Sequence, residues 1–225
     1  MVGASHPVPL APASAVVPSP RRPTGDGGSA WERTRWWYES VLGWPTAPGE
    51  PVRLRTGVRF DVLDVPAAAG YATLERLRRP GRGPLGFPVA VRGERMQLLV
   101  AAGGAEELPG LLEWLEWGSL ALDLTAVGAG GLVEAPLVPV VTVVPEPGPA
   151  GPPPRPPERD GVRGAAVWLR PPEPGCEAGS SLPALSALGR AGTVLDLARL
   201  VRTLATQCHR VRLTAGRPPP ARPVA

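Results

Sequence analysis

Lysine, asparagine and isoleucine are absent from this chain of 225 residues. All 24 basic residues are therefore arginines, which outnumber the 20 acidic residues and give a formal charge of +4. The three absences together indicate a GC-rich codon bias, so the arginine content alone is weak support for phosphate binding. A basic balance permits nucleic-acid binding, but the arginines are scattered along the chain, a pattern typical of a solvated surface.

Cysteine and histidine are scarce, with two of each. Cys176 and Cys208 form no CxxC motif, and of the histidines only His209 lies away from the N-terminal tail. This argues against a zinc site. Ser180-Ser181 lacks the G-x-S-x-G frame of a nucleophilic hydrolase, and the chain has neither a P-loop nor a dinucleotide-binding fingerprint.

Long apolar runs are also missing. No window approaches 18 uninterrupted apolar residues, and the N-terminal stretch has no basic segment followed by a continuous apolar one. We therefore expect a cytoplasmic protein with neither a membrane partner nor a signal peptide.

Proline and glycine, by contrast, are abundant, with 32 and 28 copies, and they concentrate at both ends and in one internal run. Such composition is typical of disordered or linker segments. The predicted organisation is a disordered N-terminus (1–28), a core (29–144), a proline-rich linker (145–160), a C-terminal strand and helix (161–213) and a disordered tail (214–225). The fold class expected for the ordered part is α+β, with a small mixed or antiparallel sheet flanked by helices.

Local signals predict the elements of that core. Ser29 and Glu32 have the spacing of a capping box at the start of a helix that Gly43 ends. The aromatic residues of this helix are interpreted as core rather than as a base-stacking surface. Further helices are predicted at 67–79, 105–117 and 193–212, a hairpin at 88–91 and 95–101, and strands at 59–65, 120–125, 131–137 and 164–170.

The stretch Thr56–Ala69 carries the main candidate site. Asp61 and Asp64 lie on its predicted strand, and carboxylates near a strand end are common ligands of divalent cations. Side chains three apart on a regular strand point to opposite faces. Only a bulge that shifts the register would therefore bring Asp61 beside Asp64.

Three stretches, in order, resemble the N-terminal domain of bifunctional DNA primase/polymerases, the prim-pol branch of the archaeo-eukaryotic primase superfamily. Thr56-Gly57 through Leu63-Asp64-Val65 resembles the family's turn and L-D-h-D strand. Ala90–Met96 resembles its T-x-x-G-G-x-H hairpin, and Leu122–Pro136 resembles its D-h-R-x-x-G-G-h-h-h-A-P segment. Trp168 also falls where the family tends to have an aromatic residue.

The resemblance implies nucleotidyl transfer in DNA replication, with Mg²⁺ or Mn²⁺ held by three carboxylates and a histidine contacting the incoming nucleotide. Asp64 matches the first carboxylate and Asp123 the third. The second falls on Pro66 and the histidine on Met96, while the arginine of the third motif falls on Thr125 or nearby. Arg92 and Arg95 remain beside the hairpin as candidates for binding nucleotide phosphates.

Three functions follow as alternatives. The first is a degenerate prim-pol-like domain that retains nucleotide or nucleic-acid binding in DNA metabolism. The second is an active primase or polymerase that uses Asp61, Asp64 and Asp123 as its carboxylates. The third is a non-catalytic module that binds a protein partner through the proline-rich segment or the apolar face of the C-terminal helix.

Overall fold

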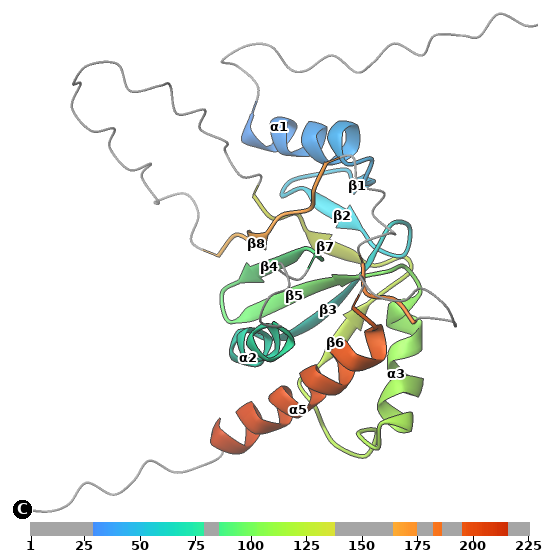
Figure 1. The fold of residues 1–225 in the computed structure, drawn as a ribbon. Helices are drawn as coiled ribbons and strands as arrows, with labels where there is room; N and C mark the ends of the chain where they lie inside the picture. The colour runs from blue at the N-terminus through green and yellow to red at the C-terminus, as the bar shows by residue number, and fades with distance from the viewer. Residues whose placement is uncertain (1–28, 79–85, 138–163, 175–181, 186–194, 216–225) are drawn as a thin grey trace, which may run out of the picture.

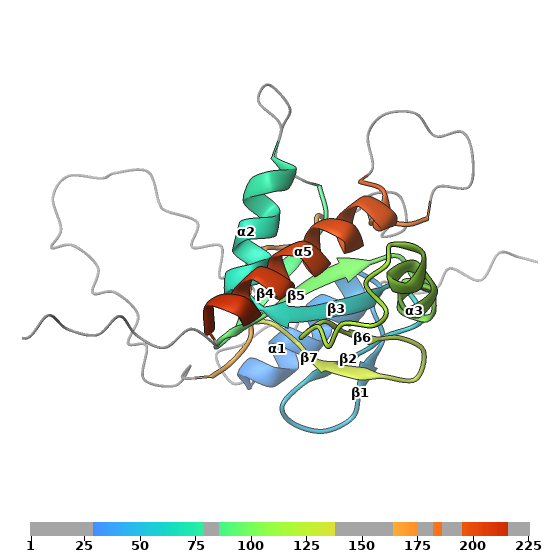
Figure 2. The same cartoon turned by 90° about the horizontal axis from the view of Figure 1, so that it is seen from below.

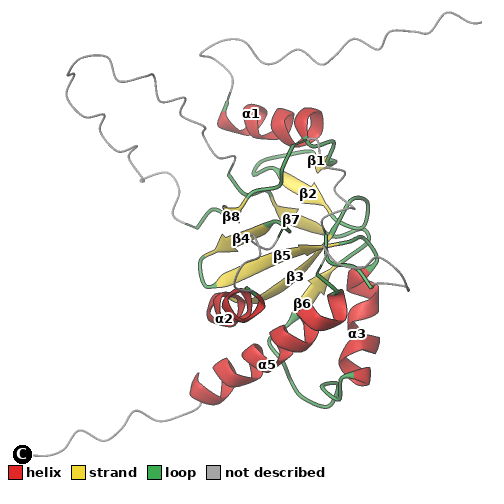
Figure 3. Cartoon of the chain, viewed as in Figure 1, coloured by secondary structure: helices red, strands yellow, loops and turns green. Residues whose placement is uncertain are grey.

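Two antiparallel sheets and a set of helices make up the ordered part of the chain (Figures 1 and 3). The structure, a computed structural model, describes residues 29–78, 86–137, 164–174, 182–185 and 195–215. This confirms the α+β class and the antiparallel sheet. The predictions for 1–28 and 145–160 lie outside the described residues, as does the predicted tail except for 214–215, which complete the last helix.

The larger sheet has the strand order β6-β3-β5-β4-β8 and the smaller one β1-β2-β7. Their bounds are β1 (Thr46–Ala47), β2 (Arg53–Arg55), β3 (Asp61–Pro66), β4 (Val89–Arg92), β5 (Arg95–Val100), β6 (Thr125–Val127), β7 (Leu132–Glu134) and β8 (Val167–Arg170). The helices are α1 (Ala30–Trp36), continued by the π-helical turn η1 (Trp37–Val41), then α2 (Ala67–Leu77), α3 (Gly104–Trp114) and α5 (Leu197–Ala215). Figure 2 shows α2 and α5 on one side of the larger sheet, with α1 and the smaller sheet on the other.

The N-terminal helix begins at the predicted capping box, in which Ser29 and Glu32 each bond the other's backbone N–H. Its aromatic side chains pack inward, and Tyr38 is fully buried. The Tyr38 hydroxyl donates to the Pro136 carbonyl at 2.7 Å and accepts from Trp168 Nε1 at 3.0 Å. Trp44 lies between the Phe60 and Trp168 rings, at centroid distances of 4.5 Å and 6.4 Å. The cluster is core, as predicted, and it ties the N-terminal helix to β8.

The central strand β3 pairs with β5 on one side and with β6 on the other. Pro66 ends it and stands at the N-cap position of α2, where a proline is tolerated because the first helical N–H groups have no partner within the helix. The hairpin β4–β5 turns at Gly93, which has φ +54°, as the Arg92-Gly93-Glu94 sequence predicts.

The strands on either side of the glycine-rich turn 128–131 are shorter than the sequence predicts and belong to different sheets. β6 pairs with β3, whereas β7 pairs with β2. No strand forms over residues 120–124. The turn therefore crosses between the sheets, and Thr56 holds it there by donating from its backbone N–H to the Gly131 carbonyl and from Oγ1 to the Gly128 carbonyl.

Helix α5 covers the larger sheet beside α2 and α3. The predicted apolar stripe is buried against this chain's own core, with Val211 half-buried at its end. The stripe consists of Leu197, Val201, Leu204, Cys208 and Val211, of which the first four are buried. It is therefore part of the core rather than a surface for a partner protein. None of the helices in the described part of the chain is long and apolar enough to cross a membrane.

Candidate functional site

Strand β3 carries its two aspartates on opposite faces. The β3–β5 register runs without a shift from the Asp61–Val100 pair to the Pro66–Arg95 pair. Because the strand contains no bulge, side chains alternate strictly between the faces. Asp61 points to the side of α3, whereas Asp64 points to the side that carries Arg95 and Gln97. The condition under which Asp61 would join Asp64 is not met.

Asp61 instead binds the start of α3. Its side chain is fully buried, and Oδ2 accepts hydrogen bonds from the backbone N–H groups of Gly103 at 2.8 Å and Ala105 at 3.0 Å. These are N–H groups that a helix cannot satisfy internally, and a carboxylate also suits the positive end of the helix dipole. Burial raises the pKa of Asp61, and the two backbone hydrogen bonds offset only part of that rise. This arrangement assigns Asp61 a structural part in the fold.

Asp64, Asp123 and Arg95 form the centre of the candidate site. The Arg95 guanidinium lies between the two carboxylates, with Nη2 at 2.5 Å from Asp64 Oδ1 and Nη1 at 2.7 Å from Asp123 Oδ1. Gln97 Nε2 donates to the other Asp64 oxygen at 3.3 Å. The structure thus brings Asp64 and Asp123, which are 59 residues apart in sequence, to the same guanidinium.

The Arg95 guanidinium offsets part of the negative charge of this cluster. Burial alone would lower the pKa of Arg95, but hydrogen bonds to Asp123 and Asp64, together with their charges, raise it overall. Arg95 therefore stays protonated and neutralises part of the charge of the two carboxylates. The side chain of Asp64 is 18% exposed and that of Asp123 is 59% exposed, so water screens the Arg95–Asp64 ion pair less than the Arg95–Asp123 ion pair.

These residues do not fit a pair of divalent metal ions. Two cations about 4 Å apart need several carboxylates to offset their mutual repulsion, and here two carboxylates already share one guanidinium. Across the described ranges, no three histidine, cysteine or acidic side chains come close enough to hold a metal ion. Pro66 occupies the position on β3 that shares a face with Asp64, so it supplies no ligand there.

The other candidate phosphate ligand, Arg92, is also paired within the chain. Its Nη2 lies 3.0 Å from Glu134 Oε2 on β7, and its Nε donates to the Gly164 carbonyl at 3.3 Å. Arg92 and Arg95 lie directly opposite each other in the hairpin, so the two guanidinium groups share one face. Half of the Arg92 side chain is exposed to solvent.

The strand register also shows which hairpin residue faces Asp64. Met96, the position that the resemblance matches to the family histidine, is fully buried on the opposite face, where an added Cβ at Gly70 of α2 would lie 2.2 Å from its Sδ. Gln97, the next residue, points toward Asp64. Thr125, matched to the motif arginine, pairs with Asp64 across β3–β6. Alternation along the hairpin was the signal that could have identified Gln97 as a member of this face, whereas the position of Glu134 depends on how β7 of the smaller sheet packs.

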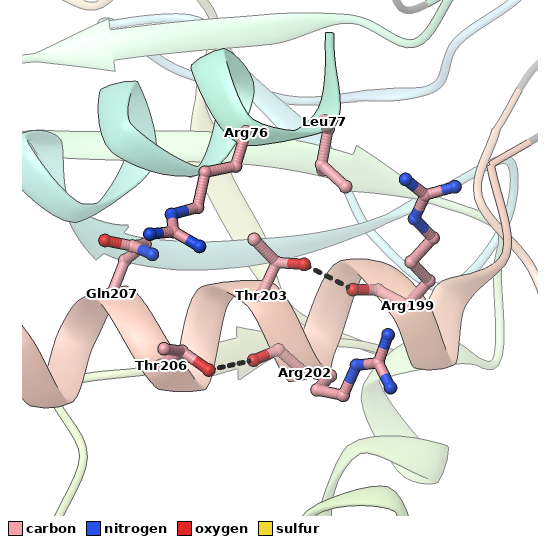
Figure 4. A pocket seen from close by; sticks show the side chains of 7 residues that line it. All are labelled: Arg76, Leu77, Arg199, Arg202, Thr203, Thr206 and Gln207. Atoms are coloured by element: carbon pink, nitrogen blue, oxygen red, sulfur yellow. Dashed lines mark hydrogen bonds between the residues drawn. The ribbon is translucent and has the colours of Figure 1, made fainter. Parts of the chain in front are cut away.

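A second polar feature of the structure was not predicted from the sequence. Between α2 and α5 lies a cavity of about 280 Å³ lined by Arg76, Arg199 and Arg202 together with Thr203, Thr206 and Gln207 (Figure 4). From the sequence alone, the arginines of α5 are interpreted only as part of a scattered basic surface. Their i, i+3 spacing, set beside an arginine near the end of α2, was the available signal.

Comparisons with protein-family models, with curated proteins and with solved structures give no match for this chain.

Proposed function

We propose that this protein is a divergent prim-pol-like domain that binds a nucleotide or a nucleic acid in DNA metabolism without polymerising it. The observation that carries the proposal is the position of Arg95, whose guanidinium bonds Asp64 and Asp123 at the point where the resemblance puts the metal-binding carboxylates. A site whose carboxylates are held by an arginine retains polar groups for binding but lacks the charge needed for two-metal chemistry.

The absence of the family's second carboxylate and of its histidine from this sequence agrees with the proposal. Pro66 and Met96 replace them, and Gln97 contributes an amide on the face of Asp64. Arg92 remains half-exposed beside the cluster, so a phosphate that displaces Glu134 from it would gain a charge-assisted hydrogen bond. The chemistry left to this face is recognition of a phosphate-bearing ligand.

The test is a calorimetric titration of the full chain with a deoxynucleoside triphosphate, with and without Mg²⁺ or Mn²⁺, alongside a primer-extension assay. We expect binding that does not require metal, and no extension of the primer. Metal-dependent incorporation that is lost in Asp64→Ala would overturn the proposal. Absence of triphosphate binding would remove the nucleotide half of it and leave nucleic acid as the ligand to be measured.

A gain-of-function pair sharpens this test. Arg95→Gln releases the two carboxylates, and Pro66→Asp adds a third on the same face of β3. The double variant is expected to bind Mn²⁺, seen as loss of the free-ion signal in electron paramagnetic resonance. The matched control is Pro66→Asn with Arg95→Gln, which has the same shape without the third charge. Equal Mn²⁺ binding by the wild type would contradict the role given to Arg95.

A further inference from the structure

The residues that line the groove between α2 and α5 supply hydrogen-bond donors and include no acidic side chain. Of the residues that line it, Arg76 comes from α2, and Arg199, Arg202 and Gln207 come from α5. No carboxylate forms an ion pair with these three arginines anywhere in the described residues. Figure 4 shows Arg199 and Arg202 at one end of the groove and Arg76 beside Gln207 at the other.

Gln207 is the second, independent observation. Its side chain is 5% exposed, and its Nε2 has no hydrogen-bond partner among the described residues. A buried amide donor without an acceptor is costly to keep. Here the Gln207 amide stands next to the Arg76 guanidinium, which has donors and no acceptor. An oxyanion between these groups would satisfy both at once.

The hydroxyl groups of the groove leave their oxygen atoms as further acceptors. Thr203 and Thr206 donate to the carbonyls of Arg199 and Arg202, both at 2.8 Å. Their protons are thus engaged along the helix, as is common for threonine within helices. The donors available to a ligand therefore come from the three guanidinium groups and the Gln207 amide.

The arginines continue along the same side of α5. Arg199, Arg202 and Arg210 lie on one face of the helix together with Thr206, because their spacing of three and four residues keeps side chains on one side. Arg210 is exposed, and none of the described carboxylates pairs with it. Eleven residues of helix extend for about 16 Å, which is the axial length of about five phosphates on one strand of duplex DNA. The basic stripe thus extends beyond the cavity.

The size and lining of the groove favour a polymer over a free nucleotide. A volume of about 280 Å³ is at the small end of the range of roughly 300 to 1,000 Å³ usual for small-molecule pockets. It has no aromatic residue in its lining on which a base would stack. Arginine is suited to bidentate contacts with phosphate. We therefore expect the groove to accept a phosphate while the rest of the ligand stays outside.

We propose that the α2–α5 groove and its extension to Arg210 bind the phosphodiester backbone of a nucleic acid without regard to base sequence. This surface lies on the helix side of the larger sheet (Figure 2), whereas the side chains of Asp64 and Arg95 project from the opposite face of β3 and β5. The inference stands on α2 and α5 alone and does not depend on the prim-pol-like assignment. It predicts affinity that falls with added salt, because each phosphate contact releases condensed counterions.

The test is fluorescence anisotropy of the full chain with a labelled single-stranded 20-mer of mixed sequence, repeated over a range of salt concentrations. Arg199→Gln with Arg202→Gln removes two contacts, so we expect the slope of log K against log salt to become shallower by about 1.4. Arg53→Gln with Arg55→Gln, on exposed positions of β2, is the control of equal charge change and should leave the slope unchanged. An equal decrease of the slope in the two double variants would overturn the proposal.

Gln207→Met separates binding from packing. The substitution removes a buried donor without a partner and keeps a side chain of similar shape, so the melting temperature of the free protein should rise. The affinity for the 20-mer should nevertheless fall several-fold. Wild-type affinity in this variant would show that Gln207 meets no ligand, and the inference would fail.

Two further arms identify the ligand and keep the proposals apart. If a deoxynucleoside triphosphate displaces the 20-mer at concentrations near those at which the oligonucleotide itself competes, the groove binds free nucleotide and the backbone proposal is wrong. The groove variants leave Asp64, Asp123 and Arg95 in place, so the triphosphate titration of the sheet face should be the same in them as in the wild type. Failure of one proposal is thereby visible while the other is retained.

Discussion

Arg95 and Asp64 lie diagonally across the β3–β5 pair, with Arg95 Nη2 2.5 Å from Asp64 Oδ1. Diagonal neighbours on one face of an antiparallel pair are within reach of long side chains, so the ion pair follows directly from the strand register. The same guanidinium reaches Asp123 in the segment that leads into β6. Arg95 thereby places one positive charge beside both carboxylates, where the prim-pol resemblance would put a metal ion. This links the strand register to the proposed loss of metal chemistry.

Asp61 provides the first prediction. Asp61→Ala leaves the N–H groups of Gly103 and Ala105 without an acceptor, and it should lower the free energy of unfolding by about 2–3 kcal/mol. Asp61→Asn keeps an acceptor and should cost less. Urea unfolding at neutral pH measures both. Asp64→Ala is the comparison on the opposite face, where solvent reaches the site, and a larger loss there than at Asp61 would contradict the assignment.

The raised pKa of Asp61 also predicts how the stability of the wild type and of Asp61→Asn changes with pH. Since burial raises the pKa of Asp61 above its ordinary value of 3.8, the folded protein binds this proton more tightly than the unfolded chain does. The part of the Asp61 contribution to stability that depends on its protonation is therefore fully present below that value and is lost as the pH rises through the folded-state pKa. The hydrogen bonds to Gly103 and Ala105 are a separate contribution. Asp61→Asn has no carboxyl group to titrate at this position. As the pH rises through the acidic range, the free energy of unfolding of this variant should therefore decline less than that of the wild type.

Gly57 is the second prediction, because its backbone touches the glycine-rich turn. It has φ +83°, and a Cβ there would lie 2.2 Å from Ala129 Cα. Gly57→Ala should therefore lower the free energy of unfolding by about 2–4 kcal/mol through both the left-handed backbone and the contact. Gly49→Ala is the matched control, since Gly49 has φ +104° with open space around it. Equal losses at the two sites would show that the contact contributes nothing.

Tyr38 is the third. Its buried hydroxyl joins Trp168 of β8 to the carbonyl of Pro136, and burial raises its pKa well above the ordinary value. Tyr38→Phe leaves both partners unsatisfied and should cost about 1–3 kcal/mol of unfolding free energy. Tyr71→Phe, on an exposed side chain of α2, should cost almost nothing. A loss of similar size at Tyr71 would indicate that the hydroxyl bonds of Tyr38 are unimportant.

Much of the secondary structure could be predicted because its signals are local. The Ser29–Glu32 capping box and the turn at Gly93 need only neighbouring residues, and both formed as expected. The partition of β6 and β7 between two sheets depends on pairing with β3 and β2, far away in sequence. Alternation along a regular strand placed Asp61 and Asp64 on opposite faces. It could not show that Arg95 binds both Asp64 and Asp123, because that requires the position of the segment before β6.

The α2–α5 groove was missed for a similar reason. Arg199 and Arg202 could be placed off the apolar stripe of their helix, but their relation to Arg76 depends on how α5 crosses α2. Gln207 lies one residue before Cys208, on the buried side, so its amide appears as an ordinary interior glutamine until the neighbouring helix is in place. Tertiary packing, not composition, turns scattered arginines into a candidate binding surface.

Cys208 gives the last prediction. It is 2% exposed, and burial, with a smaller contribution from the charge of Asp123, raises the pKa of its thiol from 9.0 to about 12. The unfolded chain therefore loses this proton first, and the contribution of Cys208 to stability is fully present below pH 9 and is lost as the pH rises toward 12. Over that window the loss should approach about 1.4 kcal/mol for each pH unit. Urea unfolding under reducing conditions between pH 8 and 10.5 measures it. Cys208→Ala should begin from a lower stability at pH 8 but decline less steeply, because the remaining decline then comes from other groups such as Tyr38. Parallel declines in the two proteins would mean that the thiol titrates at its ordinary pKa and is not shielded by the packing of α5.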